Sequence, residues 1–480
     1  MNRHSADMTF YSQGGRMTFR LLRQLAEEGM VHGDGTLALG SRQEIILPEI
    51  GLDSQDYMRD IVGARLPEFH PKRPNIVTTR AVASRAQRTA WLGEGSYDAI
   101  LQGFQSNPAI AVDIVDPIQH SVPLFTGQAH FVATPEPDYW QLYLNVLPEG
   151  DRIALSQAIH TDDVAAVTGV VHQHFVSRGN LDPMALQESV EALLGNRMRT
   201  LGTVALNYSQ AIRPIVGFKR DPQSDCFSLG IPVQRSPLPG AFLIDLSMLA
   251  DRCDITTVHL SPWKSLLVHG IAPSARIHFE RLILRHRINL NPGAWDHVTL
   301  NGWRSPRLKQ CANALISALN KHIPHAADLT IALVDDVMTL PDTPIVIRAK
   351  RSTHALSRFQ TAPRFSLFVR DRFERSNPRL VSHGRELRYK ALLEKLVQLI
   401  GDYGATEIET KPSAAPPARS TPAQNAHRCE ECGSEYSALY GDPLGGIEAG
   451  TPFDELPDNW SCPTCEAPMD RFRDRRGSAA

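Results

Sequence analysis

The chain has 480 residues, of which 42% are hydrophobic and 21% charged, and its formal net charge at pH 7 is −2. These values are typical of a soluble globular chain with two to four domains. No apolar run reaches the length of a membrane span, and the N-terminal residues up to Asp7 lack the apolar core of a secretory signal. We therefore expect a cytoplasmic protein with no membrane and no nucleic-acid partner.

The first predicted elements form a pattern that returns later in the chain. A helix pattern ends near Gly29, and strands follow at residues 36–39 and 45–47. Residues 35–50 align without a gap with residues 256–271. The apolar positions of these two stretches coincide: Leu37 with Val258, Leu39 with Leu260, Ile45 with Leu266, and Ile50 with Ile271.

The correspondence continues through the middle of the chain. Three further pairs of segments match in order: strands at 75–78 and 297–300, helices at 96–104 and 311–319, and strands at 111–116 and 330–335. Between the matched segments of the first half and the start of the second half, we predict strands at 131–133 and 142–146 and helices at 162–175 and 183–195. Residues 1–215 and 216–380 are therefore predicted to be two versions of one α+β unit.

Short motifs inside this duplication resemble those of the nitrite and sulfite reductase family, including its precorrin-3B-synthase relatives. Ser41-Arg42-Gln43 lies where that family often has Thr-Arg-Gln, and Ser261-Pro262-Trp263-Lys264 resembles its Thr-Pro-Trp variant. Residues 227–233 resemble the strand that opens the second half of those proteins. The resemblance covers about residues 10–350. It implies a duplicated body in which ferredoxin-like half-domains alternate with larger cofactor-binding domains.

The body departs from this family at the positions of the cluster ligands. Reductases of the family bind a four-iron cluster, linked to sirohaem, through a Cys-x5-Cys and a Cys-x3-Cys motif. Here Cys311 occupies the second position, but Ser305, Leu333 and Val337 stand at the other three. We therefore expect no 4Fe-4S cluster, and sirohaem stays open as a cofactor. Cys226, Cys253 and Cys311 are interpreted as buried thiols that act as small apolar residues.

Basic residues in both copies are candidates for binding an anion such as a carboxylated tetrapyrrole. Arg42 and Lys264 have nearly equivalent positions in the repeat, and we predict that both border one cleft between the halves and bind the cofactor. The other candidates are Arg73, Arg80, Arg85, Arg88, Arg304 and Arg307. The alternative interpretation is that these side chains are solvated surface charges.

A helix with an apolar stripe is predicted over residues 383–400, within a segment at 381–401. Residues 402–427 are predicted to form a flexible linker, because Lys411 to Gln424 are mainly proline, alanine and serine. A tether of this length gives an effective concentration in the millimolar range at a docking site within its reach.

Two Cys-x-x-Cys pairs, Cys429/Cys432 and Cys462/Cys465, lie near the end of the chain, separated by residues 433–461. Each pair places two thiolates on one turn, so the four sulfurs can form a tetrahedral cage for Zn²⁺ or iron. Disulfides are less favoured, because the chain has seven cysteines, an odd number, and no visible secretory signal.

The surroundings of these cysteines resemble the rubredoxin family over residues 428–474. The shared positions are Gly433, Tyr436, Gly441-Asp442-Pro443, Gly446-Ile447, Gly450-Thr451, Phe453, Leu456-Pro457, Trp460, Pro463 and Phe472. The resemblance implies one iron that shuttles between Fe3+ and Fe2+ in a site of four cysteines. We expect Tyr436, Phe453, Trp460 and Phe472 to form an apolar core that shields the sulfurs. Ser434 and Glu466 depart from the family pattern without removing a ligand. The alternative is a structural zinc ribbon.

Acidic residues are concentrated in this C-terminal segment. Residues 428–474 contain eleven acidic and three basic residues, a net charge of −8, so the rest of the chain carries +6. We interpret the chain as an electron-transfer protein whose iron domain is tethered to a degenerate reductase-like body. The body would dock redox partner proteins, namely a reductase that donates electrons and an acceptor enzyme.

Two other interpretations stay open. One is an oxidoreductase whose body binds a tetrapyrrole or another cofactor fed by the iron domain. The other is a zinc-ribbon scaffold without a redox role. Whether the chain is an enzyme is therefore left open by the sequence.

Overall fold

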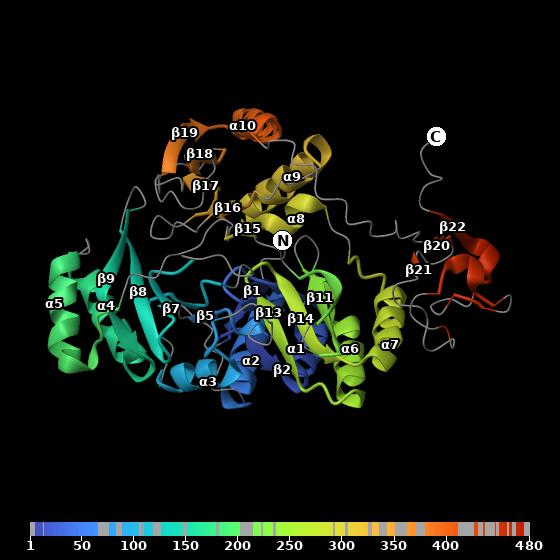
Figure 1. Cartoon of the computed structure of the whole chain (residues 1–480), viewed down its shortest axis with the longest axis horizontal. Coiled ribbons are helices and arrows are strands. Elements are labelled where there is room, and N and C mark those ends of the chain that lie inside the picture. Colours follow the sequence, from blue (N-terminus) through green and yellow to red (C-terminus); the bar gives the residue numbers. More distant parts are fainter. Residues whose placement is uncertain are drawn as a thin grey trace. The chain divides into compact units, whose positions relative to one another are not determined.

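In the computed structural model, whose helices and strands are labelled in Figure 1, the chain forms two compact units. The first unit comprises Met1–Gly270 and Leu290–Thr406, and the second comprises Ile271–Asn289 and Glu407–Ala480. The residues that the structure describes are 5–12, 14–65, 76–82, 89–104, 108, 110–118, 126–146, 151–178, 182–201, 215–221, 224–233, 237–290, 293–302, 306–324, 329–335, 343–350, 362–370, 380–410, 427–430, 435–436, 447, 451–457, 460–462 and 467–474.

Two small sheets each contain a strand from the other half of the duplication. The first sheet contains, in order, β1 (Ser5–Tyr11), β4 (Glu44–Gly51), β3 (Thr36–Leu39) and β12 (Leu238–Pro239). The second contains β10 (Gly217–Arg220), β11 (Phe227–Pro232), β14 (Ser265–Ile271), β13 (Thr257–Ser261) and β2 (Arg16–Thr18). β12 pairs with β3, and β2 pairs with β13. The two halves therefore exchange edge strands.

Helices α1 (Phe19–His32) and α6 (Gly240–Arg252) have equivalent places in the two halves and pack against each other. α1 begins after Thr18, whose hydroxyl accepts a hydrogen bond of 3.2 Å from the backbone N–H of Leu21. α2 (Leu52–Arg65) follows β4 as α7 (Pro273–Arg285) follows β14. The difference in residue number between the starts of α1 and α6 is the same as between the starts of β3 and β13, of β4 and β14, and of α2 and α7.

Each half also contains a five-stranded mixed sheet. The first contains β5 (Ile76–Thr78), β6 (Val112–Val115), β7 (Ala129–Ala133), β8 (Tyr139–Val146) and β9 (Asp151–His160). The second contains β15 (Thr299–Asn301), β16 (Ile331–Val334), β17 (Ile345–Lys350), β18 (Arg364–Arg370) and β19 (Leu380–Leu387). In both sheets the first three strands are parallel and the last two pairings are antiparallel.

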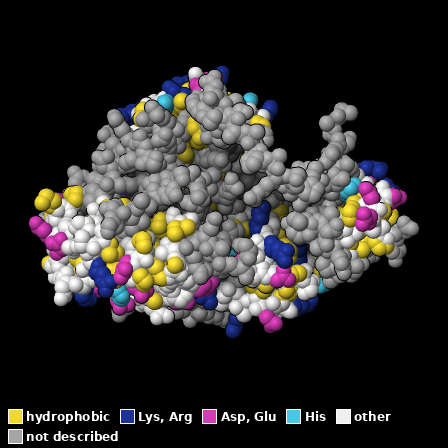
Figure 2. Space-filling model, viewed as in Figure 1, with side chains coloured by type: hydrophobic (Ala, Val, Ile, Leu, Met, Phe, Trp, Pro, Cys, Tyr) yellow, Lys and Arg dark blue, Asp and Glu magenta, His cyan; other side chains and the backbone are white. Residues whose placement is uncertain are grey.

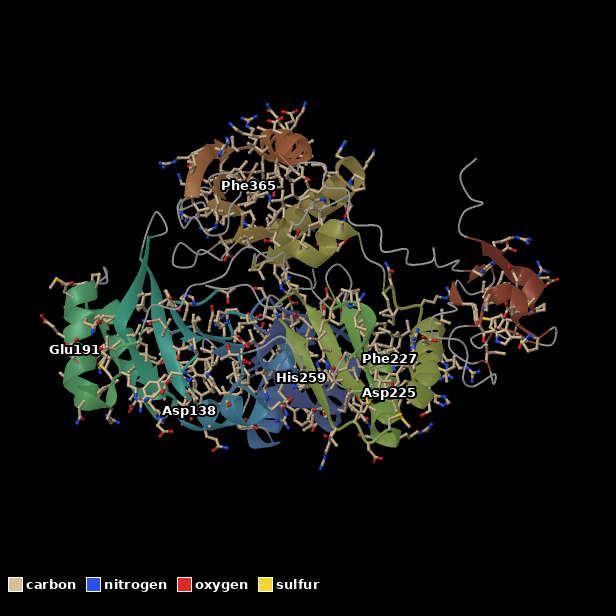
Figure 3. The ribbon with its side chains drawn as sticks, viewed as in Figure 1. Asp138, Glu191, Asp225, Phe227, His259 and Phe365 are labelled. Carbon is tan, nitrogen blue, oxygen red and sulfur yellow. The ribbon has the colours of Figure 1, made fainter. Side chains whose placement is uncertain are left out.

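Helices accompany both sheets and bury the apolar faces of the strands. The first half adds η1 (Arg80–Val82), α3 (Glu94–Gln102), η2 (Thr161–Asp163), α4 (Val164–Arg178), α5 (Pro183–Leu194) and η3 (Gly195–Arg197). The second half adds α8 (Ala294–Val298), α9 (Pro306–His322) and α10 (Tyr389–Thr410). Phe131 and Trp140 lie in the first large core, and Trp295 lies in the second. Phe365, labelled in Figure 3, also belongs to the second core.

The predicted fold class, an α+β body built from two copies of one unit, is confirmed by this arrangement of sheets. The strands predicted at 36–39, 131–133 and 142–146 all lie within observed strands. The predicted domain boundaries at 215/216, 380/381 and 401/402 stay predictions.

One predicted helix starts in the wrong place. The helix predicted over 383–400 begins at Tyr389, because Leu380–Leu387 is strand β19. The backbone of β19 pairs with β18, for example Val381 with Val369, and this pairing outweighs the helical spacing of the apolar residues. α10 then continues to Thr410, into the segment predicted as a linker, and residues 411–426 of that segment lie outside the described residues.

The C-terminal domain contains a small antiparallel sheet and two short turns of 3-10 helix. The strand order is β21 (Glu435–Tyr436), β20 (His427–Cys429) and β22 (Phe472–Asp474). The turns are η6 (Phe453–Glu455) and η7 (Met469–Arg471). Across the described parts of the whole chain, no helix combines the length and the apolar character that crossing a bilayer requires.

Candidate metal centre and the turns of the body

The first candidate ligand, Cys429, ends the central strand of the C-terminal sheet and is 1% exposed. It pairs with Phe472 in β22, and the next residue, Glu430, donates its backbone N–H to the carbonyl of Arg471 at 2.8 Å. The sheet therefore holds the thiol of Cys429 inside the domain, where a charged thiolate requires a metal or another positive partner.

The second described ligand, Cys462, is fully buried. Its backbone N–H donates to the carbonyl of Ala467 at 2.8 Å, and Ser461 and Pro468 form an adjacent β-bridge. Cys429 and Cys462 belong to the same buried cluster, although they come from different Cys-x-x-Cys pairs. The partners that the motifs assign to them, Cys432 and Cys465, lie outside the described residues.

Aromatic rings pack around the two buried cysteines, as the sequence predicts. Phe453 lies 5.6 Å from Tyr436, 5.9 Å from Trp460 and 5.4 Å from Phe472, measured between ring centroids. Trp460 in turn lies 5.3 Å from Tyr436 and 5.2 Å from Phe472. The Tyr436 hydroxyl donates to the carbonyl of Thr451 at 2.7 Å, so its polar end is satisfied.

His427 is a member of this shell that sequence reasoning missed. Its ring stacks on Phe453 at a centroid distance of 4.0 Å and an interplanar angle of 11°. Its position two residues before Cys429 could have revealed it in the sequence, since alternate residues of a strand lie on the same face.

The donor set fits a soft metal ion. Buried cysteine sulfurs in an aromatic shell suit iron or zinc, whereas calcium and magnesium require oxygen ligands. Cys429, Cys432, Cys462 and Cys465 would supply four thiolates and complete a tetrahedral site.

In the body, the turn between β3 and β4 carries the predicted site residue Arg42. The Arg42 side chain is 11% exposed, and its Nη1 lies 2.9 Å from Asp113 Oδ1. Arg42 also donates to Thr126 Oγ1 and to the carbonyl of Val112, both at 3.0 Å. Its charge is therefore already compensated by the first large sheet.

The carboxylate of Asp113 is the group to which Arg42 and its neighbours bind. His130 Nδ1 lies 2.9 Å from Asp113 Oδ2, and the backbone N–H groups of Thr126 and Gly127 donate to the same oxygen. Burial alone would raise the pKa of Asp113, but Arg42 and His130 outweigh burial and hold that pKa well below its usual value. Asp113 therefore stays ionised and holds the turn.

Trp263 occupies the place of Arg42 in the second half of the repeat. Its side chain is 1% exposed and packs with Leu300, Ala332, Val334 and Val346 of the second large domain. The same turn therefore anchors each half, once through an ion pair and once through an apolar ring.

The next position in each turn has a left-handed backbone, with φ of 59° at Gln43 and 55° at Lys264. The amide of Gln43 donates to the carbonyls of Leu260 and Thr78, at 2.7 and 3.2 Å, and accepts from Thr78 N. Lys264 is instead half-buried, and burial lowers its pKa to about 8, against the charge of Glu44. Lys264 therefore carries an amine where the first half carries an amide.

Arg42 and Lys264 both approach Glu44. The backbone N–H of Arg42 donates to Glu44 Oε2 at 2.8 Å, and the charge of Glu44 raises the pKa of Lys264. The cleft predicted between Arg42 and Lys264 stays a prediction.

The other predicted anion ligands have varied surroundings. Arg80 is 3% exposed and pairs with Asp98 at 2.7 Å and with Glu94 at 3.4 Å, so its charge is compensated. Arg307 is exposed on α9. Four candidates lie outside the described residues: Arg73, Arg85, Arg88 and Arg304.

His259 on β13 is a buried titratable group that sequence reasoning missed (Figure 3). Its Nε2 lies 3.7 Å from Glu94 Oε1, and neither ring nitrogen has a hydrogen-bond partner among the described residues. Its ring centroid is 5.3 Å from that of His269, which bonds Ser228 and the carbonyl of Ala81. Burial, then His269, Arg80 and Arg16, hold the pKa of His259 well below its usual value.

The fold and the candidate site define a duplicated α/β body joined to a small cysteine-lined metal domain. The family model described as Rubredoxin matches residues 426–472. Rubredoxin 4 of Rhodococcus sp. (strain Q15) is 46% identical over 46 residues, which are 10% of this chain and 77% of that protein. Rubredoxin-2 of Chlorobaculum tepidum is 49% identical over 45 residues, which are 9% of this chain and 86% of that protein. Through this C-terminal domain the chain belongs to the rubredoxin family, which implies electron transfer by a cysteine-bound iron.

The body has a structural relative of its own. The NirA protein of Mycobacterium tuberculosis superposes with a TM-score of 0.64 over 85% of this chain and 82% of that one, with 11% sequence identity. At that identity the likeness concerns the fold alone. The duplicated fold that the sequence predicts for the body is thereby confirmed as a NirA-like fold.

Replacing Cys462 by alanine should abolish stoichiometric iron binding, because a cage of four thiolates has no spare ligand. Elemental analysis and the visible absorption spectrum of the purified protein measure this loss. Cys226→Ala in the body is the matched control and should keep the iron. Full iron content in Cys462→Ala would show that this cysteine is not a ligand.

Replacing Arg42 by methionine should destabilise the body by about 3–5 kcal/mol, because it leaves the buried Asp113 carboxylate without its cationic partner. The double variant Arg42→Met/Asp113→Asn should lose less than the sum of the single variants, as urea denaturation would measure. Arg23→Met, at an exposed pair with Glu27, is the control and should have little effect. Strict additivity would argue against the coupling.

Stability should fall as the pH drops from about 7 to 5, because unfolded His259 takes up a proton near pH 6.5 that the folded protein does not bind. His259→Gln should reduce this slope, measured as the melting temperature at several pH values. His322→Gln, at an exposed site on α9, should leave the slope as in the wild type. An unchanged slope in His259→Gln would contradict the assignment.

Proposed function

We propose that this chain is an electron-transfer protein in which Cys429, Cys432, Cys462 and Cys465 hold one iron, tethered to a reductase-like body that docks a redox partner. The burial of Cys429 and Cys462 in one aromatic cluster carries the proposal. Membership of the rubredoxin family supports it, since that family implies an iron bound by cysteines.

The surroundings of the cysteines suit the transfer of single electrons. The iron, when bound, supplies a one-electron change between Fe3+ and Fe2+. Tyr436, Phe453, Trp460 and Phe472 bury the sulfurs and limit the reorganisation of water around them. Backbone N–H groups that follow the ligands can donate to sulfur and thereby favour the reduced, more negative site.

The body is proposed to act without a four-iron cluster. Leu333, at one of the positions where the cluster needs a ligand, is fully buried in β16 and packs in the second large core. Cys311 is half-buried on α9, and Ser305 and Val337 lie outside the described residues. The body then offers a surface for a redox partner.

A second candidate function is an oxidoreductase whose body binds sirohaem, another tetrapyrrole or a different anionic cofactor. The half-buried amine of Lys264 favours this candidate, because a cation held partly away from water attracts an anionic group. Arg42 would contribute less to such a site, since Asp113 already compensates its charge.

Protein purified in air should be red and should lose its colour on chemical reduction, as expected for ferric iron bound by four thiolates. Metal analysis and a visible spectrum test this directly. Soret-type bands in addition would favour the oxidoreductase. Stoichiometric zinc in colourless protein, from cells grown with ample iron, would sink the proposal and leave a zinc-ribbon scaffold.

A further inference from the structure

Helix α7 presents basic side chains to solvent along one face. Ser274, His278, Arg281 and Arg285 are exposed, and their helical spacing, alternately four and three positions, places them in one row. The opposite face is buried through Phe279, Leu282 and Ile283. The row from His278 to Arg285 is called the α7 stripe below.

The surroundings of the α7 stripe are positively charged. Residues 273–287 contain four arginines and one acidic residue, Glu280, a net charge of +3. Glu280 Oε1 lies 2.6 Å from Arg276 Nε, one turn away on the same helix. The only acidic side chain of this segment is therefore engaged with an arginine outside the stripe.

The fold itself does not require this charge. α2, the equivalent helix of the first half, has three aspartates and two arginines, a net charge of −1. Asp60 and Ala64 take the places of Arg281 and Arg285, while buried Met58 takes the place of buried Phe279. At the described positions, the two helices thus share a buried apolar residue and differ in charge at exposed Asp60 and Arg281, which points to a role for the stripe beyond packing.

The C-terminal domain has the complementary charge. Residues 428–474 carry a net charge of −8. Figure 2 shows acidic side chains exposed on this domain, and the exposed acids of the described residues are Glu430, Asp454, Glu455 and Asp470. Glu430 pairs with Arg473 at 2.9 Å. Asp454 and Glu455 lie on η6, directly after Phe453 of the aromatic shell, so they mark a face close to the cluster that contains the cysteines.

The chain connects the two surfaces. Residues 271–289 and 407–480 belong to the same compact unit. Between Thr410 at the end of α10 and His427 at the start of β20, the chain can extend to at most about 60 Å. A tether of that length gives an effective concentration in the millimolar range, so docking requires only a weak intrinsic affinity, with a Kd of about 1 mM.

We propose that the α7 stripe is the docking surface for the acidic C-terminal domain of the same chain, with Asp454 and Glu455 on η6 facing Arg281 and Arg285. The role of this docking rests on the proposed function, since docking would determine where the electron carrier contacts the body. The contact itself does not depend on that function.

Small-angle X-ray scattering of the intact protein tests the contact. Screening grows as the Debye length falls from about 30 Å at 0.01 M salt to about 3 Å at 1 M. The radius of gyration of the wild type should therefore rise with salt. Arg281→Glu/Arg285→Glu should show the larger radius already at low salt and lose the salt dependence.

Two further variants give this test its specificity. Arg20→Glu/Arg252→Glu makes the same charge change on the exposed surfaces of α1 and α6 and should behave as the wild type. Adding Asp454→Arg/Glu455→Arg to Arg281→Glu/Arg285→Glu reverses both partners and should restore the compact form at low salt. Visible spectra and melting curves of each variant verify that the iron domain and the body remain folded.

The outcomes separate the docking from the proposed function. A radius of gyration independent of salt in the wild type, or a charge swap that fails to restore the compact form, would overturn the docking. If the protein is nevertheless red and reducible, the proposed function still holds. Colourless zinc protein that still becomes compact at low salt would overturn the function and support the docking.

Discussion

The exchange of edge strands between the two halves is the constraint on which the body depends. β2 completes the sheet of β13, and β12 completes the sheet of β3, so each small sheet lacks an edge without the other half. The turns that follow β3 and β13 then anchor the two large domains through Arg42 and Trp263. The two halves of the sequence thus form one cooperative framework, in which unfolding of one half exposes the sheet edge of the other.

Equivalent positions in this framework use different chemistry. Arg42 satisfies a buried carboxylate, whereas Trp263 buries an apolar ring among Leu300 and its neighbours. A buried ion pair must overcome the desolvation of two charges, so its net contribution to stability is small, while the ring contributes through buried area. Gln43 and Lys264 share a left-handed backbone and differ in their side chains. The copies have therefore kept their geometry and diverged in the groups that they present.

Local pattern and repeat predicted much of this structure, because both depend on nearby residues. The alignment of residues 35–50 with 256–271 located equivalent strands, and the cysteine spacing with its aromatic residues located the C-terminal core. Contacts between distant segments were beyond such reasoning. Arg42 pairs with Asp113 from a remote part of the first half, and the exchange of β2 and β12 joins the two halves. The end of β19, from His383 to Leu387, was assigned to the helix that follows it, because its pairing with β18 leaves no signature in apolar spacing.

The C-terminal domain differs from the body in how it reaches stability. Among its described residues, the core adds Ile447, Leu456, Ala467 and Met469 to the cysteines and their aromatic shell. A domain of this size rarely gains more than about 3–5 kcal/mol from its apolar core. Metal–thiolate bonds absent from the unfolded chain would add to that stability, so under the proposed function the four cysteines would serve both folding and electron transfer. Within the described residues, the body buries two large apolar cores of its own. The covalent link between the two domains therefore raises their effective concentration for each other more than it raises the folding stability of either domain.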